Sequence, residues 1–135
     1  MRSRLLNLVS AAALAVGGVL LPAAPANAAP DDCFHKFACF YKNFEYTFKE
    51  LTRDNATTCE NLDKPINDTM SSVINYTDMT LVLYQHYNWL GKYVLVPTGG
   101  GFSRLDYVPI YNQDNSFYGY NTFNDRVSSF CILWR

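Results

Sequence analysis

The sequence predicts an all-β protein, a two-sheet sandwich built from two tandem copies of one motif. Aromatic residues are unusually frequent, with 10 Tyr, 9 Phe and 2 Trp in 135 residues. They alternate with polar residues in stretches such as "CFYKNFEYTF" and "LVLYQHYNWLGKYVLV", and no long run keeps the 3.6-residue period of an amphipathic helix. A turn sequence also occurs twice, as "NDTMSS" at residues 67–72 and as "NDRVSS" at residues 124–129. Such repetition indicates a duplicated structural unit.

The N-terminal stretch is typical of an export signal rather than of a strand. Two arginines precede a long apolar run, and "ANA" ends at Ala28 with small residues at the cleavage positions. A membrane anchor is the alternative, but polar residues interrupt the run and a cleavage pattern follows it. We therefore expect a signal peptide at residues 1–28, secretion to the extracellular medium, and one mature domain at residues 29–135.

Four cysteines follow the signal, and in an oxidising compartment they are expected to form two disulfides. Four cysteines allow three pairings. We expect Cys33–Cys39 as a local link near the N-terminus, which leaves Cys59–Cys131 as the second bond. A zinc site is the alternative, but the spacings form no paired CxxC knuckles and no histidine cluster accompanies them.

Each copy of the motif reads as a strand, an aromatic hairpin, a second strand, a loop and then the NDxxSS turn, which leads into a last strand. "FYKNFEY" in the first copy corresponds to "LYQHYNW" in the second, 43 positions later. The copies therefore span about residues 33–77 and 78–135, and the second carries about 14 extra residues within 97–121. Four short strands per copy would share one core, because neither half buries enough apolar surface alone.

The charge of the mature chain excludes several kinds of partner. After the signal, 9 basic and 12 acidic side chains remain, and the basic residues are scattered singly. Such a chain has no basic patch for nucleic acid and no basic amphipathic helix for a membrane surface. We expect a monomer whose partner is a protein, a metal ion or a small molecule.

These motifs resemble two known groups of proteins. "YQHYNWLG", with Tyr84, Trp89 and Gly91, is similar to the aromatic hairpin of the βγ-crystallins, and both NDxxSS turns are similar to the calcium-binding pattern of that family. A secreted chain with this double motif and cysteines near its N-terminus also resembles the bacterial, streptomycete-type metalloproteinase inhibitor family. The resemblance implies a βγ-crystallin-like Greek-key sandwich that inhibits an extracellular protease by binding and has no enzymatic activity.

The resemblance also implies two weak calcium sites, each shared between the two copies. Their ligands would be Asp68, the Thr69 carbonyl and Ser128 in one site, and Asp125, the Arg126 carbonyl and Ser71 in the other. Calcium prefers such oxygen ligands, and with about one carboxylate per site we expect a Kd on the order of 10⁻⁵ to 10⁻³ M. The alternative requires no metal, because Asn-Asp pairs favour turns and the serines can tie down a neighbouring hairpin.

Two departures limit what the resemblance implies. Phe48 occupies the position of the hairpin glycine in the first copy, where a positive φ is expected, so we expect the first hairpin to fold differently or to be longer. The inhibitor family holds its reactive loop in the second half with a short disulfide, and here only Cys131 lies after residue 59. No reactive-site residue is therefore assigned.

The best candidate for a protease-binding loop, by composition, is the inserted stretch. Its apolar centre consists of Tyr107, Val108, Ile110 and Tyr111. Folding of this stretch back onto the sandwich is the alternative. A rival function is a calcium-binding βγ-crystallin-type structural or cell-surface module without inhibitory activity. A third is a carbohydrate-binding module that uses surface tyrosines and Trp89.

Overall fold

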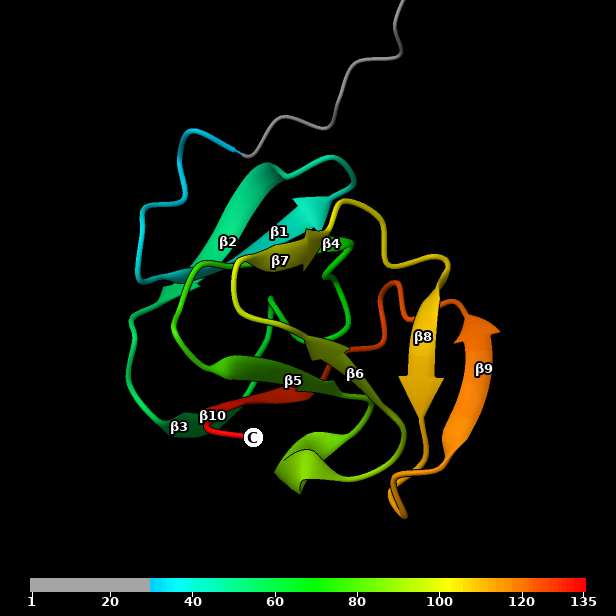
Figure 1. The fold of residues 1–135 in the computed structure, drawn as a ribbon. Coiled ribbons are helices and arrows are strands. Elements are labelled where there is room, and N and C mark those ends of the chain that lie inside the picture. Colours follow the sequence, from blue (N-terminus) through cyan, green and yellow to red (C-terminus); the bar gives the residue numbers. More distant parts are fainter. Residues whose placement is uncertain (1–29) are drawn as a thin grey trace, which may run out of the picture.

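The computed structural model describes residues 30–135, so the expected signal peptide at residues 1–28 lies outside the described residues. The described part forms strands and one short 3₁₀ helix (Figure 1). These elements are β1 (Ala38–Asn43), β2 (Thr47–Arg53), β3 (Thr58–Asn61), β4 (Ser72–Asn75), β5 (Thr80–Tyr84), η1 (Tyr87–Trp89), β6 (Tyr93–Val96), β7 (Gly100–Phe102), β8 (Val108–Tyr111), β9 (Phe117–Asn121) and β10 (Ser129–Leu133). No helix among these residues is long and apolar enough to cross a membrane.

The strands form two antiparallel sheets that exchange one strand between the copies. The four-stranded sheet has the order β2-β1-β4-β7, and the six-stranded sheet has the order β3-β10-β5-β6-β8-β9. β3 comes from the first copy yet pairs with β10, while β7 from the second copy pairs with β4. The predicted all-β sandwich of two Greek-key motifs is therefore confirmed.

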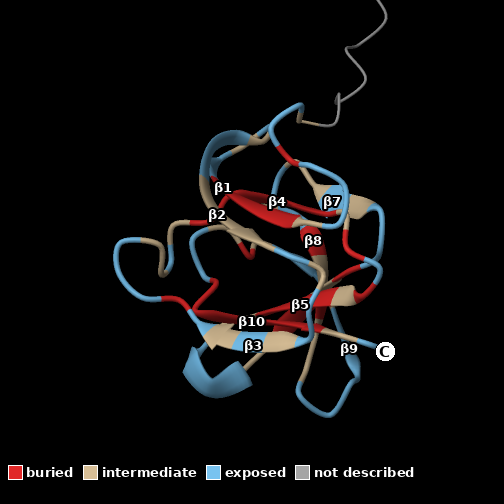
Figure 2. Cartoon of the chain, turned by 90° about the vertical axis from the view of Figure 1, so that its left-hand side faces the viewer, coloured by how far each residue is buried: buried red, intermediate tan, exposed pale blue. Residues whose placement is uncertain are grey.

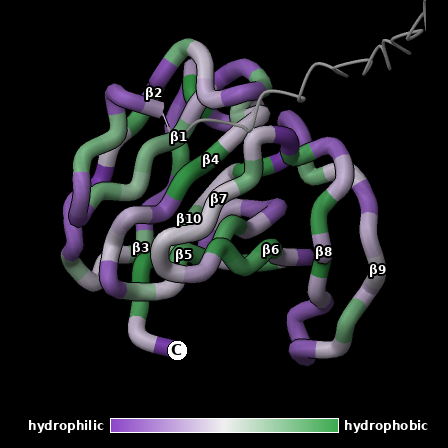
Figure 3. Tube along the Cα trace, turned by 45° about the horizontal axis from the view of Figure 1, so that its top comes forward, coloured by the Kyte–Doolittle hydropathy of each residue, from purple (hydrophilic) through white to green (hydrophobic). Residues whose placement is uncertain are grey.

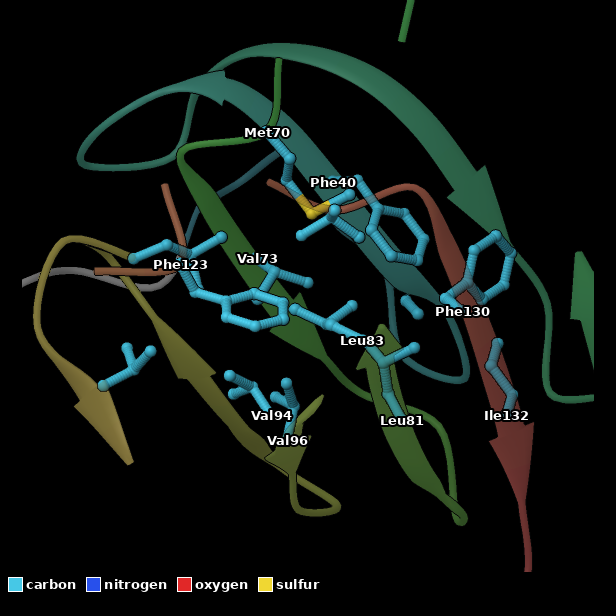
Figure 4. Close-up of a cluster of buried hydrophobic side chains, with 14 of the residues drawn as sticks. Phe40, Met70, Val73, Leu81, Leu83, Val94, Val96, Phe123, Phe130 and Ile132 are labelled. Atoms are coloured by element: carbon cyan, nitrogen blue, oxygen red, sulfur yellow. The ribbon is translucent and has the colours of Figure 1, made fainter. Parts of the chain in front are cut away.

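The core lies between the two sheets and accounts for the alternation in the sequence. Successive side chains of a strand point to opposite faces, so every second residue enters the core. Phe40 of β1 meets Phe130 of β10 with ring centroids 5.0 Å apart (Figure 4). The six-stranded sheet contributes Leu81, Leu83, Val94, Val96, Val108, Ile110, Phe130 and Ile132 to this cluster. Figure 2 shows the buried segments between the layers, and Figure 3 shows hydrophobic residues concentrated along β4, β5, β6 and β8.

Both predicted disulfides are confirmed. Cys33 and Cys39 join the N-terminal arm (residues 30–37) to β1. Cys59 of β3 and Cys131 of β10 are directly opposed in register, with their Cα atoms 4.1 Å apart. The second bond therefore links a strand of the first copy to a strand of the second copy within one sheet.

The two aromatic hairpins share one pattern of positive φ, so the expectation that the first would fold differently is wrong for these positions. In each hairpin three residues adopt a positive φ at equivalent positions. They are Glu45 (55°), Tyr46 (56°) and Phe48 (61°) in the first, and Asn88 (55°), Trp89 (60°) and Gly91 (82°) in the second. Phe48 thus occupies the glycine position in a left-handed conformation that costs an L-residue about 1–2 kcal/mol.

We expect Phe48→Gly to raise the free energy of unfolding by about 0.5–1 kcal/mol. The substitution relieves the left-handed strain at the cost of some backbone entropy, and little packing is lost because the Phe48 side chain is 68% exposed. Urea denaturation measures the change. Gly91→Ala is the matched control and should destabilise, because its Cβ would lie 2.6 Å from His86 Cδ2. A less stable Phe48→Gly variant would contradict the strain assigned to this residue.

Candidate functional site

The two NDxxSS turns lie against each other and are joined by a reciprocal pair of backbone hydrogen bonds. The N–H of Asp68 donates to the carbonyl of Val127 at 3.1 Å, and the N–H of Asp125 donates to the carbonyl of Met70 at 3.0 Å. Met70 and Val127 are completely buried. Each turn is therefore held by the other copy, which gives the duplication a structural reason.

The second serine of each turn ties down the aromatic hairpin of its own copy. Ser72 Oγ donates to the carbonyl of Asn43 at 2.6 Å and accepts from the N–H of Tyr46 at 3.1 Å. Ser129 Oγ makes the same two bonds in the second hairpin, to the His86 carbonyl at 2.6 Å and from the Trp89 N–H at 3.2 Å. Both serines are completely buried. Their hydroxyls are engaged in the fold without a metal ion.

Two members of one expected calcium ligand set, Asp68 and Ser128, lie in contact. Ser128 Oγ donates to Asp68 Oδ1 at 3.0 Å, a separation close to that of two oxygens that share a Ca²⁺ ion at about 2.3–2.6 Å. A hollow of about 230 Å³ adjoins this pair and is also lined by Gln85, His86, Asp125 and Arg126. The chemistry of this donor set, carboxylate and hydroxyl oxygens beside backbone, fits a hard cation.

Each NDxxSS turn also contains one buried amide oxygen without a hydrogen-bond partner in the described part of the chain. The amide oxygens Asn67 Oδ1 and Asn124 Oδ1 are buried and have no hydrogen-bond partner among the described residues. Their Nδ2 groups donate to the following aspartates, Asp68 and Asp125, at 3.2 and 2.8 Å. Buried oxygens without donors are uncommon in folded proteins. Across residues 30–135 no three His, Cys, Asp or Glu side chains gather into a metal-binding group, so carbonyl and hydroxyl oxygens would supply most ligands.

The second expected ligand set is less complete. No hydrogen bond joins the side chains of Asp125 and Ser71 in the described part of the chain, and only Asp125 of these two lines the hollow beside Asp68. Arg126 is exposed and lines the hollow beside Asp68. The side chains of Asp68 and Ser128 are therefore in contact, whereas those of Asp125 and Ser71 are not hydrogen-bonded to each other.

The inserted stretch forms a β-hairpin, and the expectation of an apolar binding loop is corrected. Val108 and Ile110 are 0% and 2% exposed, because alternate residues of β8 point into the core, so they cannot contact a partner. Tyr107 is 72% exposed. Tyr111 is half-buried and stacks on Tyr93 at 5.6 Å. β8 and β9 thus extend the six-stranded sheet, at the right of Figure 1.

A continuous row of aromatic rings crosses the outer face of this sheet. The strand register places them side by side, and neighbouring ring centroids lie 5.4–5.9 Å apart. The row runs through Tyr84, Tyr93, Tyr111, Phe117, Tyr120 and Tyr107. Such packed pairs each stabilise by about 0.5–1.5 kcal/mol beyond their burial. The hairpin is therefore held rigidly even though much of its aromatic surface faces solvent.

The turn that joins β8 to β9 (residues 112–116) is fixed by its own hydrogen bonds. The N–H of Asn112 donates to the Ser116 carbonyl at 2.9 Å, and Ser116 donates to Asp114 Oδ1 through its N–H at 2.9 Å and its Oγ at 2.5 Å. These bonds from Ser116 hold the pKa of Asp114 below its usual range, so its carboxylate stays charged and keeps the turn closed.

β9 is an open edge of the six-stranded sheet, and it carries functional candidates that the sequence reasoning did not single out. Phe117, Tyr118 and Tyr120 are 55%, 49% and 57% exposed. Tyr120 is paired with Pro109. Hydrogen-bonded and non-hydrogen-bonded pairs alternate along an antiparallel ladder, and counting from the bonded pair of Asn112 and Ser116 makes this a non-hydrogen-bonded pair, as suits a proline without an N–H. The N–H of Tyr120 then faces the open edge. The signal in the sequence was the alternating "SFYGYN".

Comparison with known proteins gives three results. Residues 26–96 match the family model described as Peptidase inhibitor family I36. A solved structure from work on the evolution of the eye lens βγ-crystallin domain fold is similar over 80% of this chain and 94% of that chain, with a TM-score of 0.55 and 13% sequence identity. At that identity the similarity concerns the fold alone. No curated protein sequence matches the chain significantly.

Proposed function

The chain belongs to peptidase inhibitor family I36, and from this premise we propose that it inhibits an extracellular metallopeptidase by binding through the open edge of β9. The observation that carries the proposal is a rigid, extended edge strand with three exposed aromatic side chains. Two disulfides are in keeping with an extracellular location. Inhibition would result from occupation of the cleft, without catalysis by the inhibitor itself.

Extended segments suit peptidases, which hold their substrates as strands. An edge strand offers unpaired backbone groups that can add to a partner's strand, while alternate side chains enter its pockets. β9 supplies both, and the aromatic row keeps it in one conformation before binding. Because the strand is already ordered, it loses little conformational entropy on association. This saving is the usual reason why a rigid inhibitor binds tightly.

The inserted hairpin can also replace the missing loop disulfide. Tyr107 and Tyr120 stack at 5.4 Å on the outer face, and Val108 and Ile110 anchor the same strand pair in the core. A loop held this way needs no covalent link to remain in place. Tyr107 and Tyr111 therefore stay in the proposed contact region, while Val108 and Ile110 support it from beneath.

Inhibition assays with the purified mature protein test the proposal. A thermolysin-like metallopeptidase and a serine peptidase are titrated with the protein, with and without added calcium. We expect stoichiometric inhibition of the metallopeptidase at micromolar concentrations. If neither peptidase is slowed while calcium raises the melting temperature, the chain is instead a calcium-stabilised structural or cell-surface module. The contact between Asp68 and Ser128 is the observation that favours this second function.

We further propose that Ca²⁺ bound by Asp68 and Ser128 stabilises the junction of the two copies. For a Kd of about 10⁻⁴ M, 1 mM calcium would add about 1.4 kcal/mol and raise Tm by roughly 5–10 °C. Asp68→Asn should abolish that shift, as measured by thermal melts with calcium and with EDTA. Asp63→Asn, at an exposed position outside the hollow, is the matched control. An unchanged calcium shift in Asp68→Asn would contradict the site.

A further inference from the structure

A second hollow lies on the outer face of the six-stranded sheet, away from the paired turns. It has a volume of about 340 Å³, at the lower end of the range for small-molecule sites. Tyr84, Tyr93 and Leu133 form its floor, and Trp89, Asn115 and Arg135 stand around it. Figure 1 shows η1 and the turn between β8 and β9 projecting from the same side of the sheet, at the bottom of the view.

The corresponding face of the first copy is covered by the chain itself. Tyr41, the counterpart of Tyr84, is 0% exposed. It packs with Cys33 and Phe37 of the N-terminal arm, and its hydroxyl donates to Asp32 Oδ1 at 2.7 Å. In the second copy Tyr84 is only half-buried, whereas Tyr93 beside it is 4% exposed and its hydroxyl is bonded by Asn115 and Arg135. The hollow therefore lies where the second copy leaves open a part of the face that the first copy buries.

The polar groups around the hollow are already fixed in position. Asn115 Oδ1 accepts from the Tyr93 hydroxyl at 2.8 Å and from an Arg135 Nη at 2.7 Å, and Gln113 Nε2 donates to the Trp89 carbonyl at 3.3 Å. The Asn115 Nδ2 group donates to none of the described residues, and no carboxylate among them pairs with Arg135. Planar amide and guanidinium donors thus remain available beside the exposed ring of Trp89 and the half-buried ring of Tyr84.

We propose that this hollow binds a saccharide unit of a polysaccharide. The C–H face of a sugar ring packs on the electron-rich faces of Trp89 and Tyr84, and the planar amide and guanidinium groups match pairs of neighbouring hydroxyls. An extended peptide fits less well, because the floor is the middle of a sheet whose backbone groups are already paired in the ladder. The hollow is bounded by η1 and the 112–116 turn, which favours a short segment of glycan.

The residues that line the saccharide site include none of β9. The site also does not depend on peptidase inhibition, since its residues lie on the outer face rather than on the edge. An inhibitor with such a site would be retained on a polysaccharide surface while β9 stays free for a peptidase.

Polysaccharide binding by the mature protein tests the site. Affinity electrophoresis is run in gels with xylan, laminarin or dextran, and depletion is measured on insoluble chitin, cellulose and peptidoglycan. We expect binding to at least one of these probes, weakened by about tenfold or more in Trp89→Ala and in Asn115→Gly, since loss of one stacking or bidentate contact has that effect. Asn115→Gly keeps the positive φ of 67° at this position accessible. Tyr107→Ala, elsewhere in the aromatic row, should bind as the wild type does.

The variants are first checked for an unchanged melting temperature, and Gln113→Ala serves as a further site variant because its side chain bonds only the Trp89 carbonyl. In a Trp134→Phe background Trp89 is the remaining indole of the mature chain, so its fluorescence should change on addition of the bound saccharide. Failure of every probe to bind at millimolar sugar concentration overturns the inference. So does binding that survives in all three site variants. Loss of peptidase inhibition in Trp89→Ala without any saccharide binding would overturn the saccharide site and assign the hollow to the peptidase, while inhibition by this chain would stand.

Discussion

Replacing the Cys59–Cys131 disulfide by Cys59→Ser with Cys131→Ala is expected to lower the free energy of unfolding by about 4 kcal/mol. The bond closes a loop with a sequence separation of 72 residues, and the entropy that it removes from the unfolded chain grows with loop length. It also joins strands that come from different copies. The exposed Cys59 accepts a hydroxyl, whereas Cys131 is 3% exposed and needs an apolar replacement.

Urea denaturation of the double variant measures this effect, and the N-terminal disulfide provides the control. Cys33→Ala with Cys39→Ala opens a separation of only 6 residues, for which the same relation gives about 2 kcal/mol. A larger loss from the short link than from the long one would contradict the role of the Cys59–Cys131 bond as the main covalent tie between the copies.

Tyr120→Pro is expected to weaken peptidase inhibition by about 100-fold. The N–H of Tyr120 faces the open edge of β9, and proline removes this donor and places a ring where an added strand would lie. Loss of one interface hydrogen bond together with a steric clash amounts to about 2–3 kcal/mol, which corresponds to this factor. The fold should tolerate the change, because proline is accepted on edge strands.

Inhibition constants and melting temperatures are measured together for this variant. Tyr120→Thr is the matched control, since it removes the same ring and keeps the backbone N–H, so the difference between the two variants isolates the strand edge. Equal inhibition by Tyr120→Pro and Tyr120→Thr, with both proteins folded, would show that the edge makes no backbone contact with the peptidase.

Local patterns were sufficient to predict the strands and the duplicated turns. The alternation in "LVLYQHYNWLGKYVLV" matches the pleat of β5 and β6 directly. Asn-Asp pairs favour turns, so the position of each NDxxSS turn can be predicted from six residues. Ser72 and Ser129 bond to the hairpins, as the alternative hypothesis without a metal ion predicted.

Features that depend on contacts between residues far apart in the sequence could not be predicted from local patterns. The strained Phe48 is tolerated because the hairpin is fixed by Ser72 from 24 positions later in the chain, and that support outweighs a local cost of about 1–2 kcal/mol. The burial of Val108 follows from the pairing of Tyr111 with Tyr93, which places β8 in the sheet. The hollow beside Trp89 likewise depends on a long-range contact, the hydrogen bond from Arg135 to Asn115 in the 112–116 turn.

Amide hydrogen exchange of the protein alone and in complex with an inhibited metallopeptidase tests the role of β9 most directly. Residues 117–121 should exchange at least about tenfold more slowly in the complex, because their free N–H groups gain partners on strand addition. The β1–β2 hairpin lies in the other sheet, and its exchange rates should be unchanged. Unaltered exchange at residues 117–121 together with new protection elsewhere would place the peptidase contact outside the inserted hairpin.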